Sequence, residues 1–218
     1  MGSSDYVLNY LFNAIINLEP TKQYCEEALS KGISIQEVIS VVSKALEIVG
    51  KKYEEGEYFL SELIMAGESV KECFEVFENQ VKKEEIQFIG RAVVGTVEGD
   101  LHDIGKNLFI MFLKSMGFEV IDLGVDVPPQ KFVEAVKQYK PDIVGMSALL
   151  TTTLPSVEKT IRLLVEHGLR DKIKIIIGGA AVTKEFVEVV GADAGGVDAY
   201  EGALICKKWV EEKKNAKR

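Results

Sequence analysis

A histidine stands in a glycine-rich segment that has the character of a ligand-binding turn. The segment Gly95 to Gly105 reads GTVEGDLHDIG and contains His102, one of only two histidines in the chain. An imidazole at a strand end can bind a transition metal through one ring nitrogen while its other nitrogen is oriented by a carboxylate. Asp100, two residues before His102, is a candidate for that carboxylate.

The sequence leaves two interpretations of His102 open. A lone histidine in a loop is more often a surface or hydrogen-bonded residue, and no second histidine, cysteine pair or carboxylate cluster completes a zinc shell. If His102 binds a metal, the other ligands must come from elsewhere. A tetrapyrrole-type ring supplies equatorial nitrogens, so the protein has to offer only an axial base. His167, at the end of an expected helix, is assigned no catalytic role.

Two later segments also have unusual compositions. Ser147 to Thr153 reads SALLTTT and is rich in hydroxyl groups, which suits either a ligand crevice or a polar loop with a helix cap. Gly178 and Gly179 directly follow an apolar run, where missing side chains would admit a ligand, although such a pair is usually a tight turn.

The elements around these segments predict an α/β fold. Strand-like runs alternate with helix-like stretches, which favours a doubly wound parallel sheet, Rossmann-like or flavodoxin-like, covered on both faces. In such sheets ligands bind beyond the carboxyl ends of the strands, where all three segments stand. We expect strands at 91–97, 119–123, 142–147 and 173–177, and helices at about 105–116, 129–139, 155–167, 183–190 and 201–213.

The first part of the chain predicts a four-helix bundle. From Tyr6 to about Gln80 apolar residues recur every three to four positions, with breaks around 18–20, at 31–32 and near 54–57. Ser34 and Glu37 form an S-x-x-E capping box. A charged stretch then precedes the first expected strand, so we predict a helical cap domain over 1–88, a second domain over 89–218, and a hinge at 82–90.

Composition excludes several classes of protein. The 218 residues carry a net charge of -8 and no basic stripe, which argues against a nucleic-acid partner. No apolar run reaches the roughly 18 residues of a membrane span, and no signal peptide is recognised. We therefore expect a cytoplasmic protein. The three cysteines, Cys25, Cys73 and Cys206, show no paired spacing, so we expect buried or idle thiols and no disulfide.

Together the segments resemble a known signature. Asp100-x-His102-x-x-Gly105 is followed after 41 residues by Ser147-x-Leu149 and, after 28 more, by Gly178-Gly179. This resembles the cobalamin-binding module of corrinoid methyltransferase proteins. The stretch from Tyr53 to Leu63 also looks like the helical cap that precedes the module in methionine synthase and in methanogen and acetogen methyl carriers, so the resemblance extends over nearly the whole chain.

The resemblance implies roles for individual residues. His102 would be the lower axial cobalt ligand, replacing the dimethylbenzimidazole of a base-off, His-on cobalamin such as methylcobalamin or hydroxocobalamin. Asp100 would accept a hydrogen bond from His102, and Thr153 would extend this hydrogen-bond relay. The other expected contacts fall into three groups: the histidine loop, the slot for the nucleotide tail, and the shield of the upper face. The histidine loop would contribute Gly99, Leu101, Asp103 and Ile104. The slot for the nucleotide tail would involve Ser147, Leu149, Thr151, Gly178 and Gly179, with Gly105 opening the helix beside the tail. Tyr53, Leu60 and Leu63 would shield the upper face.

The resemblance also implies a function. Such a protein takes a methyl group on Co(I) from a substrate-specific methyltransferase and gives it to a second methyltransferase that acts on a thiol coenzyme or a tetrahydrofolate-type acceptor. The chain would then be a carrier with little catalysis of its own, served by a reductive activation protein. The sequence does not identify the methyl donor or the oligomeric state.

Three alternatives are weighed against the carrier. A cobalamin-dependent light sensor or regulator would use a cap histidine as its upper ligand, and residues 1–90 contain none. The small subunit of an adenosylcobalamin mutase shares the signature but typically lacks the four-helix cap. A flavodoxin-like or receiver domain without cobalamin would leave the spaced signature unexplained.

Overall fold

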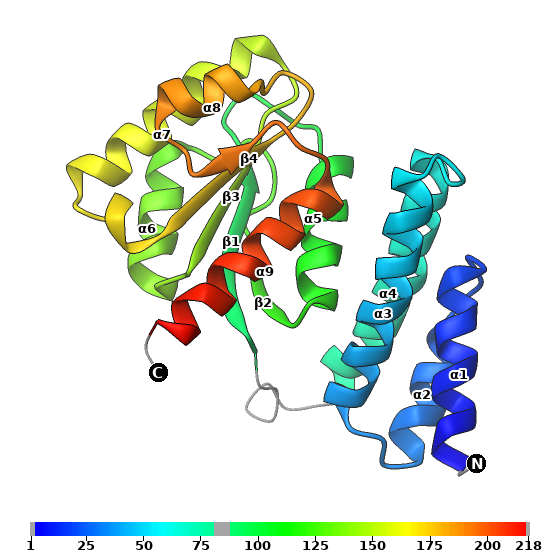
Figure 1. The fold of residues 1–218 in the computed structure, drawn as a ribbon. Coiled ribbons are helices and arrows are strands. Elements are labelled where there is room, and N and C mark those ends of the chain that lie inside the picture. Colours follow the sequence, from blue (N-terminus) through cyan, green and yellow to red (C-terminus); the bar gives the residue numbers. More distant parts are fainter. Residues whose placement is uncertain (1–2, 81–87, 217–218) are drawn as a thin grey trace. The chain divides into compact units, whose positions relative to one another are not determined.

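A computed structural model describes residues 3–80 and 88–216, which form two compact units, one containing four helices and one containing a sheet (Figure 1). The predicted fold class is confirmed. The domain boundary predicted between 88 and 89 stays a prediction, and residues 82–87 of the predicted hinge lie outside the described residues. No helix in the described part of the chain is long and apolar enough to cross a membrane.

Short turns join the four helices of the helical unit. α1 packs against α2 and α3, and α4 packs against α2 and α3. At the start of α3 the predicted capping box is present, because the Ser34 hydroxyl accepts from the Glu37 nitrogen and the Glu37 carboxylate accepts from the Ser34 nitrogen at 3.0 Å. The bounds are α1 Ser3–Ile16, α2 Lys22–Ser30, α3 Ile35–Glu54 and α4 Leu60–Gln80.

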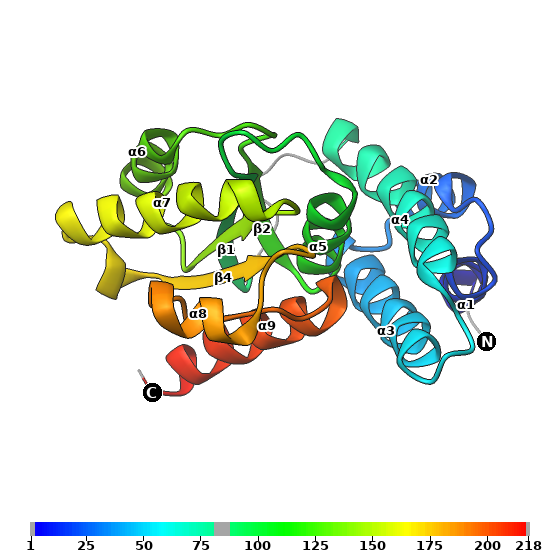
Figure 2. The same cartoon turned by 90° about the horizontal axis from the view of Figure 1, so that it is seen from above.

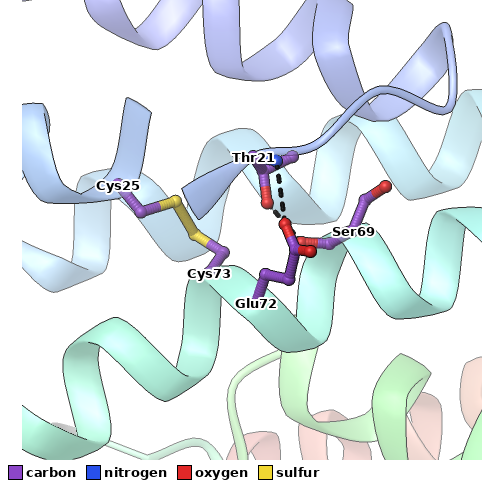
Figure 3. The surroundings of a disulfide bond; sticks show 5 residues. All are labelled: Thr21, Cys25, Ser69, Glu72 and Cys73. Atoms are coloured by element: carbon purple, nitrogen blue, oxygen red, sulfur yellow. Dashed lines mark hydrogen bonds between the residues drawn. A yellow bond between two sulfur atoms is a disulfide. The ribbon is translucent and has the colours of Figure 1, made fainter. Parts of the chain in front are cut away.

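A disulfide joins two of these helices and corrects the expectation of free thiols (Figure 3). Cys25 on α2 and Cys73 on α4 are bonded, 48 residues apart in sequence and buried. Beside the disulfide, the Thr21 hydroxyl donates to the Ser69 carbonyl, and the Thr21 nitrogen donates to Glu72 at 3.3 Å. The spacing of the cysteines did not reveal this pairing because it depends on how α2 packs on α4. Cys206 is a free, buried thiol, as expected.

The second unit is a parallel sheet with the order β2-β1-β3-β4-β5. Its elements in chain order are β1 Gly90–Thr96, α5 Ile104–Ser115, β2 Phe118–Asp122, α6 Pro129–Tyr139, β3 Ile143–Ser147, α7 Leu154–Glu166, β4 Lys174–Gly178, α8 Lys184–Val190, β5 Ala194–Gly195 and α9 Ala199–Asn215. Short 3-10 turns, Thr151–Thr153 and Arg170–Lys172, precede α7 and β4. The four expected strands and five expected helices are present within a few residues, and β5 was not predicted.

Alternating side chains along the strands build a core on each face of the sheet. Val144 and Met146 of β3 belong to an apolar cluster with buried residues of α6, α7 and α8. On the other face, a side chain at Gly145 would meet Phe109 of α5, and Gly202 of α9 lies close to Ile176 of β4. Figure 2 shows α7 and α9 on opposite sides of β4. The sheet is therefore buried on both faces, as parallel sheets are.

Candidate functional site

The three segments with unusual compositions begin at the same level of the sheet. Thr96 of β1 is the register partner of Ser147 of β3, and Ser147 is the partner of Gly178 of β4. The loops that follow these adjacent strands therefore lie side by side at the carboxyl edge. This is the edge at which doubly wound sheets bind their ligands.

The loop after β1 presents an exposed histidine on a buried carboxylate. The His102 side chain is 53% exposed, whereas the side chain of Asp100 is 0% exposed. His102 Nδ1 lies 2.7 Å from Asp100 Oδ1, and the same oxygen accepts from the His102 main-chain nitrogen at 3.0 Å. The Thr96 hydroxyl donates to the His102 carbonyl at 2.9 Å. The ring and the main chain of His102 are thus both held by Asp100, and the main chain is also held by Thr96.

The second oxygen of Asp100 is held by the loop after β3. Asp100 Oδ2 accepts hydrogen bonds from the Leu149 nitrogen at 2.7 Å, the Leu150 nitrogen at 3.4 Å and the Thr153 hydroxyl at 3.2 Å. The structure thus brings together Asp100, His102 and Thr153, which the sequence analysis grouped as a relay.

These contacts decide the charge of Asp100 and the tautomer of His102. Burial alone would raise the pKa of Asp100, but the hydrogen bonds from His102, Leu149 and Leu150 outweigh it and lower the pKa to about 2. Asp100 is therefore an ionised acceptor at neutral pH, so His102 Nδ1 must donate. In a neutral imidazole this leaves Nε2 unprotonated, with a lone pair for a metal ion.

The backbone requires glycine at one of the site's glycine positions but not at two others. Gly179 has φ +117°, and an added Cβ would come 2.1 Å from the Ala148 carbonyl oxygen, so the fold itself requires this glycine. At Gly105 and Gly178 an added Cβ would meet nothing within 4 Å, and neither residue has a positive φ. The fold does not require glycine at these two positions. A ligand that comes close to the main chain would explain why they lack side chains.

The remaining predicted contacts of the α/β unit lie at the ends of strands and in the segments that follow them. Leu101 is 71% and Ile104 61% exposed, which is unusual for large apolar side chains. Asp103 precedes α5 and accepts from the Asn107 side chain at 3.2 Å. The others are exposed or partly exposed at the strand ends, namely Gly99, Ser147, Leu149 and Thr151.

The three residues predicted to shield an upper face belong to the helical unit. Tyr53 is half-buried near the end of α3, and Leu60 begins α4 with 53% of its surface exposed. Leu63 is 4% exposed and lies in the interior of the helical unit. Their role toward a ligand stays a prediction.

Residue types did not predict an ion pair beside the histidine loop, in which a buried lysine meets a partly exposed aspartate. Lys106, in the first turn of α5, is 4% exposed, and its Nζ lies 2.7 Å from Asp122 and 2.8 Å from the Asn107 side-chain oxygen. A lysine early in a helix is ordinarily a solvated residue, so its type gave no signal. The pair ties the start of α5 to the end of β2.

Family models and known relatives point to the same family, and their matches cover nearly the whole chain. Residues 7–78 and residues 90–207 each match a family described as B12 binding domain. Trimethylamine corrinoid protein 1 of Methanosarcina acetivorans is 37% identical over 206 residues, covering 92% of this chain and 95% of that protein. Dimethylamine corrinoid protein 2 of the same organism is 36% identical and covers 95% and 98%.

Two solved structures are also similar to this chain. The crystal structure of a cobalamin-binding protein from Desulfitobacterium hafniense has a TM-score of 0.73 at 36% identity, with 93% of this chain and 98% of that chain covered. The methanol:cobalamin methyltransferase complex of Methanosarcina barkeri gives a TM-score of 0.80 at 28% identity, with 95% and 80% covered. The chain therefore belongs to the family of corrinoid proteins built from B12 binding domains.

Proposed function

We propose that the chain is a methyl carrier that holds a base-off, His-on cobalamin with His102 as the lower ligand of cobalt. It accepts a methyl group from a substrate-specific methyltransferase and donates it to a second methyltransferase with a thiol coenzyme or tetrahydrofolate-type acceptor. The observation that carries the proposal is the exposed imidazole of His102, oriented by the buried, ionised Asp100.

The residues around His102 fit a corrinoid. The unprotonated Nε2 suits a metal that already has its equatorial nitrogens and needs one axial base. Exposed Leu101 and Ile104 offer an apolar bed for a macrocycle. The open space at Gly105 and Gly178 suits a nucleotide tail that runs close to the main chain.

When bound, the cobalt supplies a nucleophile for the methyl group and then a site from which the methyl is passed on. Asp100 keeps the imidazole in one tautomer and orientation, so little entropy is lost when His102 meets the metal. Thr153 and the Leu149 nitrogen hold the second oxygen of Asp100, and the hydrogen bonds from His102, Leu149 and Leu150 keep the carboxylate ionised. The chain's own contribution is therefore to position a base, while the partner enzymes select donor and acceptor.

The test is nitrogen coupling in the EPR spectrum of the Co(II) form. The protein is reconstituted with hydroxocobalamin and reduced, using wild type, His102→Ala and the control His167→Ala, which removes the other histidine. Protein labelled with 15N-histidine is compared with unlabelled protein, because only a protein histidine on cobalt changes the splitting upon labelling. The dimethylbenzimidazole nitrogen of the cofactor does not.

We expect labelling to alter the splitting in wild type and in His167→Ala, and His102→Ala to lose the histidine coupling. Failure of wild type to bind the corrinoid, or a labelling effect that persists in His102→Ala, contradicts the proposal.

The partners are tested by methyl transfer. Relatives of this chain are trimethylamine and dimethylamine corrinoid proteins, so we propose a methylamine-dependent methyltransferase as the donor enzyme to try first. A reductive activation protein is proposed as a further partner that keeps the carrier in its reactive state. Methylation of the reconstituted chain is followed by its visible spectrum with methylamine and methanol enzymes in parallel. Methylation by the methanol enzyme alone would contradict this choice of donor.

A further inference from the structure

The loop that carries His102 is held from both of its neighbours in the sheet. Because the strand order is β2-β1-β3, the loop after β1 lies between the loops that follow β2 and β3. On the β3 side the Leu149 and Leu150 nitrogens and the Thr153 hydroxyl bond to the side chain of Asp100, and the loop's Val97 nitrogen donates to the Ser147 carbonyl at 3.0 Å. On the β2 side the hydrogen bonds go to main-chain atoms of residues 96–100.

Asp126, in the loop after β2, makes two of these main-chain contacts. Its Oδ1 accepts a hydrogen bond from the Gly99 nitrogen at 2.7 Å, and its own nitrogen donates to the Asp100 carbonyl at 3.0 Å. The residue after it, Val127, donates to the Thr96 carbonyl at 2.9 Å. Asp126 thus holds the peptide group between residues 98 and 99, one residue before Asp100, and the peptide group that directly follows Asp100.

The main chain of Asp126 is itself in a strained conformation. Its φ is +53°, in the left-handed region that few residues other than glycine, asparagine and aspartate enter. Such a conformation persists where surrounding contacts over-determine it, and it concentrates near functional sites. Asp126 is exposed, so the contact with Gly99 is not a by-product of core packing.

We propose that Asp126 is a positioning residue for His102, acting through Gly99 and Asp100; this inference rests on the proposed function. A carboxylate that accepts from a peptide nitrogen makes a stronger bond than a neutral acceptor does. The bond fixes the turn at Gly99, the turn fixes the main chain of Asp100, and Asp100 orients the imidazole. Without the Asp126 carboxylate the Gly99 nitrogen loses this acceptor, and the β2 side holds the loop through main-chain hydrogen bonds such as that of Val127 to Thr96.

The first test needs no cofactor. In NMR spectra of the apo protein, Asp126→Ala should speed hydrogen exchange at the Gly99 and His102 nitrogens by about tenfold or more and shift the ring signals of His102. Asp126→Asn keeps an oxygen acceptor and tolerates the left-handed conformation, so it should restore both signatures. Asp171→Ala, which removes an exposed carboxylate in the turn before β4, is the matched control and should change neither.

Asp126→Gly separates the hydrogen bond from the strain. Glycine relieves the positive φ but lacks the acceptor, so it should behave like alanine in exchange and in ring signals. If Asp126→Gly matches wild type, the backbone conformation rather than the carboxylate positions the loop, and the proposal is overturned. Wild-type exchange and ring signals in Asp126→Ala would overturn it equally.

The second test measures positioning in the loaded protein. In the Co(II) form we expect Asp126→Ala to lower the ratio of His-on to His-off cobalamin by about tenfold, with rescue by Asp126→Asn and none of this loss in Asp171→Ala. An unchanged ratio in Asp126→Ala overturns the inference. If wild type itself shows no histidine coupling, the proposed function fails, and the apo measurements still decide whether Asp126 positions the histidine loop.

Discussion

His102 makes two hydrogen bonds to one oxygen of Asp100, from Nδ1 at 2.7 Å and from its main-chain nitrogen at 3.0 Å. The ring and the backbone of the proposed ligand therefore share an anchor. The anchor is buried and is held in turn by Leu149 and Thr153, two residues from the loop of the neighbouring strand. Any substitution that disturbs Asp100 should move the imidazole even if His102 is intact.

Thr153→Val tests this relay at its outer end. The Thr153 hydroxyl contacts both Asp100 Oδ2 at 3.2 Å and the Leu150 carbonyl at 2.8 Å. Removing it deletes both contacts, so we expect a loss of about 1 kcal/mol in the free energy of unfolding and a lower fraction of His-on cobalamin. Thr160→Val is the matched control, because the buried Thr160 hydroxyl bonds to the Ser156 carbonyl within α7 at 2.7 Å. It should cost similar stability without altering His-on binding. Equal effects of both variants on His-on binding would contradict the relay.

The glycines give a prediction in which stability and binding move differently. Gly105→Ala should leave the apo protein as stable or up to about 1 kcal/mol more stable, because alanine favours a helix and its Cβ meets open space. Gly178→Ala should likewise leave the apo fold intact. Both should weaken cobalamin binding by about tenfold or more if the cofactor lies against the backbone there.

Gly179→Ala is the contrasting variant, because its Cβ would collide with the Ala148 carbonyl and its φ is +117°. It should destabilise the apo protein in urea unfolding. Binding titrations with hydroxocobalamin complete the comparison. Wild-type affinity in both Gly105→Ala and Gly178→Ala would place the nucleotide tail elsewhere.

Local patterns in the sequence were enough to predict most of the fold. The alternation of strands and helices and the Ser34 capping box are properties of neighbouring residues, and the structure contains both. β5 was not predicted because it consists only of Ala194–Gly195, two residues without a β-branched side chain. The disulfide was missed because Cys25 and Cys73 meet only through the packing of two helices.

The same distinction between local sequence patterns and tertiary contacts applies to the site. The contact of Asp100 with His102 is made within one turn and could be anticipated from the spacing of the two residues. The contact of Thr153 with Asp100 could be anticipated only from the family signature. The contacts of Asp126 and Thr96 could not be anticipated, because their partners are main-chain atoms, which leave no trace in residue type. The burial of Lys106 depends on Asp122, which the fold brings beside it.

Asp193 predicts how stability depends on pH. Burial alone would raise its pKa, but the hydrogen bonds from Lys174 and the Ile175 nitrogen and the charge of Arg170 outweigh it, so the pKa is lowered in the folded protein. A carboxyl with a lowered folded pKa contributes stability that is fully present above its unfolded pKa of about 4 and is lost as the pH falls through the folded value.

Asp193→Asn should therefore lower the free energy of unfolding by about 1–2 kcal/mol at pH 7 and flatten its decline below about pH 4. Urea unfolding of both proteins across the acid range measures the difference. Parallel curves for wild type and Asp193→Asn would show that the carboxylate contributes no acid sensitivity.

The Cys25–Cys73 disulfide should stabilise the helical unit. It closes a loop across a sequence separation of 48 residues, and a bond of this kind typically contributes about 2–4 kcal/mol, largely by restricting the unfolded chain. Reduction should therefore lower the melting temperature of the wild-type helical unit. Because Cys25 is 0% and Cys73 1% exposed, the reductant should act only after local opening, so reduction should be slow at low temperature.

Variants separate the disulfide from other thiol effects. A Cys25→Ala, Cys73→Ala double variant should melt at lower temperature than oxidised wild type and should not respond to reductant. Cys206→Ala removes the free cysteine, whose burial raises its pKa to about 12 and leaves it a poor nucleophile, so this variant should keep the full response to reductant. Because the disulfide lies within the helical unit, unfolding of the sheet unit should be insensitive to it. Identical melting of wild type with and without reductant, once reduction is verified by thiol counting, would show that the helices hold together without the covalent link.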